Sequence, residues 1–252
     1  MIEKTSLREG KYLYAVVSGS EELNYGVCGI NEGTVYTIPT GQMAAVVSDV
    51  ANGKIRPERR HLAAHQGVLR RLMEETVPLP VAFGIVADSR KAIQAILSAN
   101  QQAFLDQFNR VDGKVEMGLR VTWDVPNIFE YYVQTHAELK VARDRFFGSH
   151  GAPSQEDKIE LGRMFGQALN EDRETHAEKV EEVLSGHCFE IKRNKCRTER
   201  EVMTLACLVE REALPEFEEG IFEAAKLFDD NFAFDYNGPW PPHNFVDIDL
   251  KL

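Results

Sequence analysis

The chain has 252 residues, of which 43% are hydrophobic and 27% charged, so it holds enough apolar material for a sizeable buried core. It carries 40 acidic against 29 basic residues, and this net charge of -11 argues against the basic surface of a nucleic-acid-binding protein. The N-terminus has no apolar signal-peptide core, and no stretch reaches the roughly 20 apolar residues of a membrane span. We therefore expect a cytoplasmic protein with four reduced cysteines that binds neither nucleic acid nor membrane.

The first half of the chain predicts a mixed α/β domain. Apolar runs rich in β-branched or aromatic residues indicate strands at residues 12–18, 34–38 and 43–50. Pro57 suits the first turn of a helix, which continues through HLAAHQGVLRRLMEE with apolar residues at helical spacing. Pro78 ends this helix, PLPVAFGIV follows as an extended segment, and Ser89 caps one further helix over residues 90–110.

The second half predicts a ferredoxin-like domain. Strands are expected at residues 115–123, 188–193, 201–209 and 231–236. Helices are expected at residues 126–147, 154–184 and 214–228, with GSHGAP at 148–153 breaking the first two apart. This is the order β-α-β-β-α-β with a helical pair as the first crossover. The predicted class is α+β, with an N-terminal α/β domain at 1–110, the ferredoxin-like domain at 111–236 and a Pro/Trp-rich tail at 237–252.

Motifs for catalysis are missing from the sequence. His61 and His65 lie four residues apart, but HLAAH lacks the glutamate of HExxH and no third ligand can be named. We expect two histidines at a helix surface or interface. The patterns GxSxG and GxxxxGK[ST] are absent, and no GxGxxG follows a predicted strand. The sequence thus predicts no catalytic residue, no cofactor and no metal site.

The tail NGPWPPHNFVDIDLKL is the most unusual segment. Proline fixes φ and cannot donate a ladder hydrogen bond, so we expect an extended arm or a turn and neither a helix nor a central strand. A tryptophan in such a segment needs a pocket, which lies on the chain itself or on a partner. Pinning to the chain is favoured, with Trp240 closing the second domain, and the alternating FVDIDLKL could add an edge strand to a sheet. The candidate residues for tail pinning or partner binding are Pro239, Trp240, Pro241, Pro242 and Phe245.

Four segments, in order along nearly the whole chain, resemble the gas vesicle protein L/F family. They are the N-terminal YLYAVV, the VPLPVAFGIV after the helix of His65, KVEMGLRVTWD, and YNGPWPPHNFV. The last is the specific one, similar to the family's Gly-Pro-Trp-Pro-Pro-x-x-Phe-Val. Met117 departs from the aromatic residue expected in many relatives.

The resemblance implies a non-enzymatic accessory protein for the assembly of gas-filled shells. It further implies two α/β domains, and binding to the small hydrophobic shell subunit and to other gas vesicle accessory proteins. The chain would then be a minor component of the gas vesicle, assembled in the cytoplasm. Two alternatives stay open from the residues alone, a small-molecule enzyme and a ligand-sensing ferredoxin-like module, each using a pocket between the domains.

Overall fold

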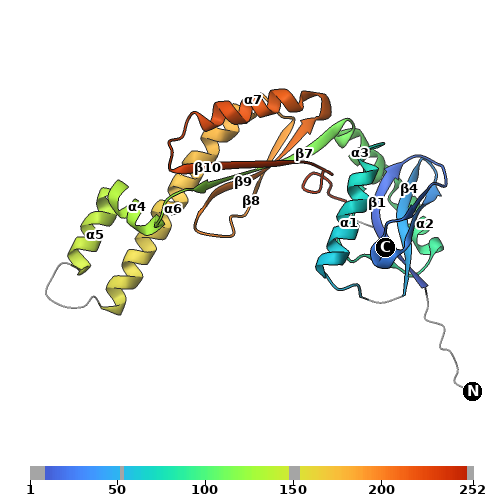
Figure 1. Cartoon of the computed structure of the whole chain (residues 1–252), viewed down its shortest axis with the longest axis horizontal. Coiled ribbons are helices and arrows are strands. Elements are labelled where there is room, and N and C mark those ends of the chain that lie inside the picture. Colours follow the sequence, from blue (N-terminus) through green and yellow to red (C-terminus); the bar gives the residue numbers. More distant parts are fainter. Residues whose placement is uncertain (1–8, 52–53, 148–153, 249–252) are drawn as a thin grey trace, which may run out of the picture. The chain divides into compact units, whose positions relative to one another are not determined.

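Two compact units make up the chain (Figure 1). The structure is a computed structural model and describes residues 9–51, 54–147 and 154–248. The first unit consists of Met1–Glu116 with Pro239–Leu252, and the second consists of Met117–Gly238. Helices are mixed with two β-sheets, which confirms the α+β class. The chain passes from one unit to the other inside two long strands, whereas the predicted ranges were 1–110, 111–236 and 237–252.

The first unit is built on a six-stranded sheet. Its strands are β1 (Glu9–Ser18), β2 (Asn24–Val27), β3 (Thr34–Thr40), β4 (Met43–Ala51), β5 (Leu79–Pro80) and β6 (Val86–Ala87). The order is β2-β3-β4-β1-β5, and β6 also pairs with β1. The central strands β1 and β4 are antiparallel, with Val16 opposite Ala45. Their nearly continuous apolar runs are buried, as expected for strands covered on both faces.

Helices cover this sheet, and one of them differs from prediction. They are the short η1 (Ile30–Glu32), α1 (Arg59–Leu72), α2 (Arg90–Ala99) and α3 (Gln101–Val111). The prediction of a single helix over 90–110 was wrong, because Asn100 leaves helical geometry at φ -115° and ψ 18°. Its amide Nδ2 donates to the carbonyl of Ile96 at 2.8 Å, so the side chain stabilises the break. The hydrophobic period continues across this break and therefore does not reveal it.

The second unit carries a four-stranded sheet in the order β10-β7-β9-β8. Its elements in chain order are β7 (Lys114–Trp123), α4 (Ile128–Thr135), α5 (Ala137–Phe147), α6 (Gln155–Leu184), β8 (Glu190–Asn194), β9 (Glu201–Glu210), η2 (Arg211–Ala213), α7 (Leu214–Ala225) and β10 (Phe232–Trp240). The helix expected over 126–147 is two helices, so that prediction was wrong. At the break His136 is extended, with φ -112° and ψ 108°, and its ring stacks on Tyr132. The break expected at 148–153 lies outside the described residues.

The long helix α6 organises the second unit. Ser154 and Asp157 form a capping box at its start. Phe165 contacts the rings of Phe129 and Tyr132 of α4, and the helix also packs against α5, α7 and β9. Across the described ranges, no helix has both the length and the apolar character needed to cross a bilayer.

Strand β10 reaches further than the sequence suggested. The predicted strand stopped at residue 236, but β10 runs to Trp240 and therefore includes Pro239. It lies at the edge of its sheet, where a proline's missing N–H breaks no ladder bond.

Candidate functional site

The tail folds as a tight turn on the first unit. The carbonyl of Pro242 accepts from the backbone N–H groups of both Phe245 and Val246 at 3.1 Å. Pro241 and Pro242 are buried, Phe245 is fully buried, and Pro239 is exposed. Trp240 is partly buried.

Trp240, which the sequence reading assigned to the second domain, contacts Arg70 of the first unit. Its ring lies under the guanidinium of Arg70 from α1, with 4.8 Å between the guanidinium carbon and the ring centroid. Sequence order misled here, because the segment that follows the second unit belongs to the first.

A buried carboxylate anchors the turn. Glu116, at the start of β7, is only 7% exposed. Its Oε2 accepts from the backbone N–H of Asn244 at 2.7 Å, and its Oε1 accepts from the Asn244 side-chain Nδ2 at 2.6 Å. Both donors bind the same carboxylate, and hydrogen bonds to a carboxylate are stronger than those between neutral groups.

His65 ties the extended PLPVAFGIV segment to the sheet. The Tyr12 hydroxyl accepts from the backbone N–H of Gly84 at 3.1 Å and lies 2.9 Å from His65 Nδ1, so it donates to that nitrogen. The other side of the imidazole hydrogen-bonds the backbone of Val81. Burial, and secondly the nearby His243, lower the pKa of His65 to about 4, so the ring is neutral at pH 7.

Both histidines of HLAAH are buried where α1 meets other elements of the first unit, so the interface expectation is met and the surface one was wrong. His61 and His65 are 6% and 2% exposed. His61 is hydrogen-bonded on both ring nitrogens at 2.9 Å, to the carbonyl of Arg56 and to the side chain of Asn31. Within the described ranges, no group of three or more His, Cys, Asp or Glu residues could hold a metal ion.

The first unit also contains an apolar pocket of about 500 Å³. Its walls come from the sheet, the PLPVAFGIV segment, the two helices α2 and α3, and the tail. The lining residues are Leu13, Val16, Ala45, Leu79, Pro80, Val81, Ala82, Ile85, Val86, Ala87, Ile93, Ile96, Leu97, Phe104, Val246, Asp247 and Ile248. The volume lies in the range of specific binding sites. Three of the four segments of the resemblance, YLYAVV, VPLPVAFGIV and YNGPWPPHNFV, thus contribute residues to one site.

The pocket is suited to binding apolar groups. Asp247 is the single charged residue of the described lining. An apolar cavity with a lone carboxylate can hold aliphatic side chains and pair with one cation, but it does not bring together the titratable groups that acid–base catalysis needs.

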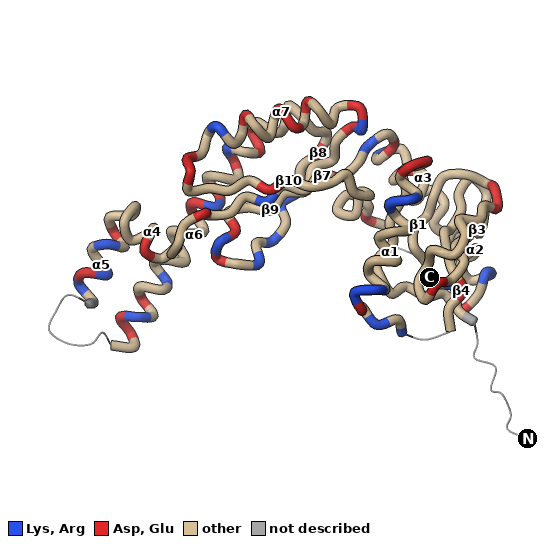
Figure 2. The backbone as a smooth tube through the Cα atoms, in the orientation of Figure 1, with Lys and Arg blue, Asp and Glu red and all other residues tan. Residues whose placement is uncertain are grey.

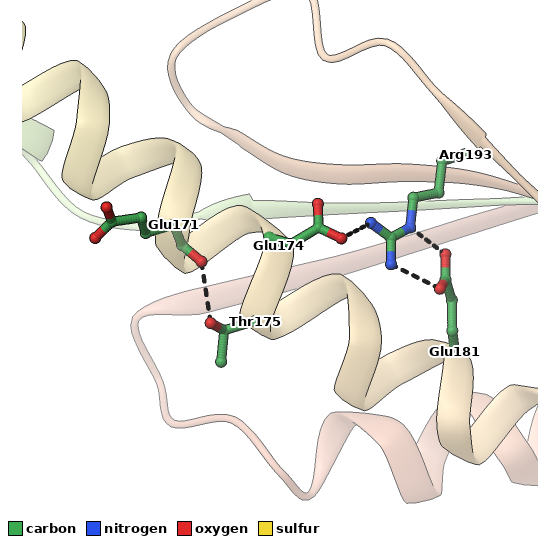
Figure 3. Close-up of polar contacts among 5 residues, drawn as sticks. All are labelled: Glu171, Glu174, Thr175, Glu181 and Arg193. Carbon is green, nitrogen blue, oxygen red and sulfur yellow. Dashed lines mark hydrogen bonds and ion pairs between the residues drawn. The ribbon is translucent and has the colours of Figure 1, made fainter.

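A charged cluster in the second unit is satisfied within the fold. Arg193 on β8 reaches two carboxylates of α6 (Figure 3). Its Nη1 lies 2.5 Å from Glu174 Oε1, and its Nε and Nη2 lie 2.5 and 2.8 Å from the two oxygens of Glu181. These hydrogen bonds raise the pKa of Arg193. The cluster therefore fastens the edge strand β8 to helix α6, and Arg193 is already paired with two carboxylates of the same unit.

The sequence reading named the tail but missed the residues that hold it. Glu116 and Asn244 are 128 positions apart, and no pattern in either segment links them. One weak signal existed, namely that Glu116 lies between the apolar residues Val115 and Met117 of a predicted strand, where a buried carboxylate needs a partner.

Comparison with known proteins gives one consistent result. The sequence profile of the family described as "Gas vesicle synthesis protein GvpL/GvpF" matches residues 10–247. "Gas vesicle protein F" of Streptomyces sp. (strain CB03234) is 25% identical over 239 residues, covering 94% of this chain and 99% of the relative. "Gas vesicle protein F2" of Halobacterium salinarum is 26% identical over 245 residues, covering 95% and 93%.

The fold also has counterparts among solved structures. The crystal structure of the gas vesicle protein GvpF from Anabaena sp. PCC7120 is similar with a TM-score of 0.81 and 22% identity, covering 95% of this chain and 99% of that one. The corresponding protein from Microcystis aeruginosa gives a TM-score of 0.79 at 21% identity, with the same coverage.

Proposed function

Because the chain belongs to the gas vesicle synthesis protein GvpL/GvpF family and so has a role in gas vesicle formation, we propose that it is a non-enzymatic accessory protein that binds the hydrophobic shell subunit. The pocket of the first unit is the observation that carries this proposal. A cavity of about 500 Å³ with an almost wholly apolar lining suits several aliphatic side chains of a partner segment. Asp247 at the tail would pair with a basic residue beside that segment.

The chain's charge supports the same role. A hydrophobic subunit aggregates when its apolar surface stays exposed. A bound protein of net charge -11 would keep such complexes in solution, because they would repel one another. We place this step in the cytoplasm, with the chain remaining as a minor component of the gas vesicle. The family implies association with other gas vesicle proteins as well, and the shell subunit is the partner proposed for the pocket.

For the second unit we propose a ferredoxin-like domain. Strand order β10-β7-β9-β8, with one helical crossover between β7 and β8 and another between β9 and β10, supports this assignment. The small-molecule alternatives would need polar groups converging in a pocket. The described lining of the 500 Å³ pocket offers Asp247 alone.

The test is co-purification with the shell subunit after coexpression. Deleting the whole tail is a poor test, because it removes the buried Phe245 along with any binding residue. Ile85 is a better position, since its side chain lines the pocket and is 46% exposed, while its carbonyl keeps its hydrogen bond from Leu13. Ile85→Glu would place a charge at the mouth of the pocket.

We expect Ile85→Glu to lose most of the co-purified shell subunit. Val141→Glu is the matched control, because Val141 is 66% exposed on α5 in the other unit. If both variants fold and retain the shell subunit equally, the pocket is not its binding site. If the wild-type chain fails to retain it, shell-subunit binding itself is wrong.

A further inference from the structure

Helix α7 exposes an acidic surface that includes an aromatic ring. Its inner face buries Phe217, Gly220, Ile221 and Ala224. On the outer face, the exposed residues Glu216, Glu219, Phe222 and Glu223 form what we call the α7 acidic surface. Phe222 is 58% exposed, although a ring of this size is normally buried. Exposed aromatic residues framed by charge are typical anchors of protein contacts.

The first unit carries a surface of opposite charge. Lys54, Arg56, Arg59 and Arg60 are all exposed, and together with the exposed Leu62 they form what we call the α1 basic surface. Glu58 is the single carboxylate in this stretch, and it pairs with Arg60 at 2.9 Å. Four cations and one carboxylate leave a net charge of +3 in a chain whose total is -11. In Figure 2 the backbone is marked blue at several positions around the start of α1 and red at several positions along α7.

The α1 basic surface lies at the N-terminus of a helix, where positive charge is unfavourable. Arg59 and Arg60 occupy the first turn of α1, which contains no acidic residue. The partial positive charge of a helix N-terminus disfavours cations there. An acidic partner surface would relieve this repulsion, so the charge of the α1 basic surface favours an acidic partner.

We propose that the α7 acidic surface of one copy packs against the α1 basic surface of a second copy. Phe222 would lie against Leu62, which is itself 41% exposed, and the carboxylates would face the arginines. Symmetric pairing of two α7 surfaces, or of two α1 surfaces, would oppose like charges. A second basic stretch, Lys192, Arg193, Lys195 and Arg197 at the end of β8, is a weaker match because Arg193 is already bound by Glu174 and Glu181.

Such a contact joins two different surfaces, so a dimer either makes it twice, reciprocally, or leaves one surface of each kind open. In the open arrangement, assembly continues with rising concentration unless the geometry closes a ring. The contact needs no shell subunit, so it stands apart from the function proposed for the pocket.

The test uses two charge-reversed variants in sedimentation velocity without the shell subunit. In the first, Arg59→Glu and Arg60→Glu make both surfaces acidic; acidic residues suit the first turn of a helix, so folding is retained. In the second, Glu219→Lys and Glu223→Lys make both surfaces basic. We expect the wild type to self-associate more strongly at about 50 mM than at about 500 mM salt. We expect each variant alone to associate about tenfold or more weakly, and a mixture of the two to recover association.

Glu178→Lys with Glu182→Lys on α6 is the matched control, since both positions are exposed and the change in net charge equals that of the second variant. It should associate like the wild type, and Phe222→Ser should weaken association without changing net charge. A wild type that stays monomeric at every concentration overturns the proposal. So does a mixture that associates no better than its components, or a control that loses as much as the second variant.

Discussion

Replacing Glu116 by glutamine should loosen the tail from the first unit. In the wild type, both carboxylate oxygens accept from Asn244, at 2.7 and 2.6 Å. The glutamine amide turns one of these acceptors into a donor that faces a donor. Hydrogen bonds to a charged group contribute about 1.5–3 kcal/mol each, so Glu116→Gln should lower the free energy of unfolding by about 2–3 kcal/mol. Asn244→Ala removes the side-chain bond alone and should cost about 2 kcal/mol.

The two tryptophans make this measurable unit by unit. Trp123 lies in the second unit and Trp240 in the first, so a Trp123→Phe background leaves Trp240 as the reporter of the tail. Urea titrations followed by its fluorescence give the free energy of unfolding for each variant and for the double variant. Because both substitutions remove the same bond, the double variant should cost about 1–2 kcal/mol less than the sum of the single variants.

Glu74→Gln is the control, since Glu74 is an exposed glutamate of the same unit, and it should change the free energy of unfolding by less than about 0.5 kcal/mol. Additive effects of Glu116→Gln and Asn244→Ala would refute the reasoning, because they would show that the two groups stabilise the fold independently.

Three further predictions concern the first unit. The pKa of His65 is about 4 in the folded state and near its ordinary 6.5 in the unfolded state, so the unfolded state binds a proton first as the pH falls. The free energy of unfolding should therefore decrease by up to about 3 kcal/mol between pH 6.5 and about pH 4. His65→Phe should flatten this part of a stability-versus-pH curve. Gly29→Ala would place its Cβ 2.5 Å from the Tyr14 hydroxyl, and should lower the thermal unfolding midpoint through a loss of about 1–3 kcal/mol. Arg70→Met should shift the emission of Trp240 and cost about 0.5–1 kcal/mol in urea titrations, whereas an unchanged spectrum would contradict the stacked geometry.

Local patterns predicted the regular elements well. The apolar run at residues 43–50 is strand β4, and the amphipathic stretch at 154–184 corresponds to α6. The YNGPWPPHNFV motif identified the family, which the sequence profile confirms. In each case the signal lies within a few consecutive residues, and hydrophobic period or proline placement is enough to read it.

Tertiary contacts decided what local patterns could not. Asn100 and His136 interrupt helices that the hydrophobic period would continue, and each break is held by a contact of the residue itself. The sequence does not show that His65 is buried, because its partner Tyr12 lies 53 positions away. The unit that receives Trp240 depends on Arg70, which is distant in sequence. Pairings of this kind leave no trace in one sequence.

The division of the first unit into two stretches has a consequence for biosynthesis. Residues 239–248 leave the ribosome only after the whole second unit has been made, at roughly 5–20 residues per second. Until then, Val246 and Ile248 are missing from the pocket wall and Glu116 lacks Asn244. The N-terminal part of the protein is therefore translated first and completed last, so a nascent chain cannot present a finished binding pocket before the second unit exists.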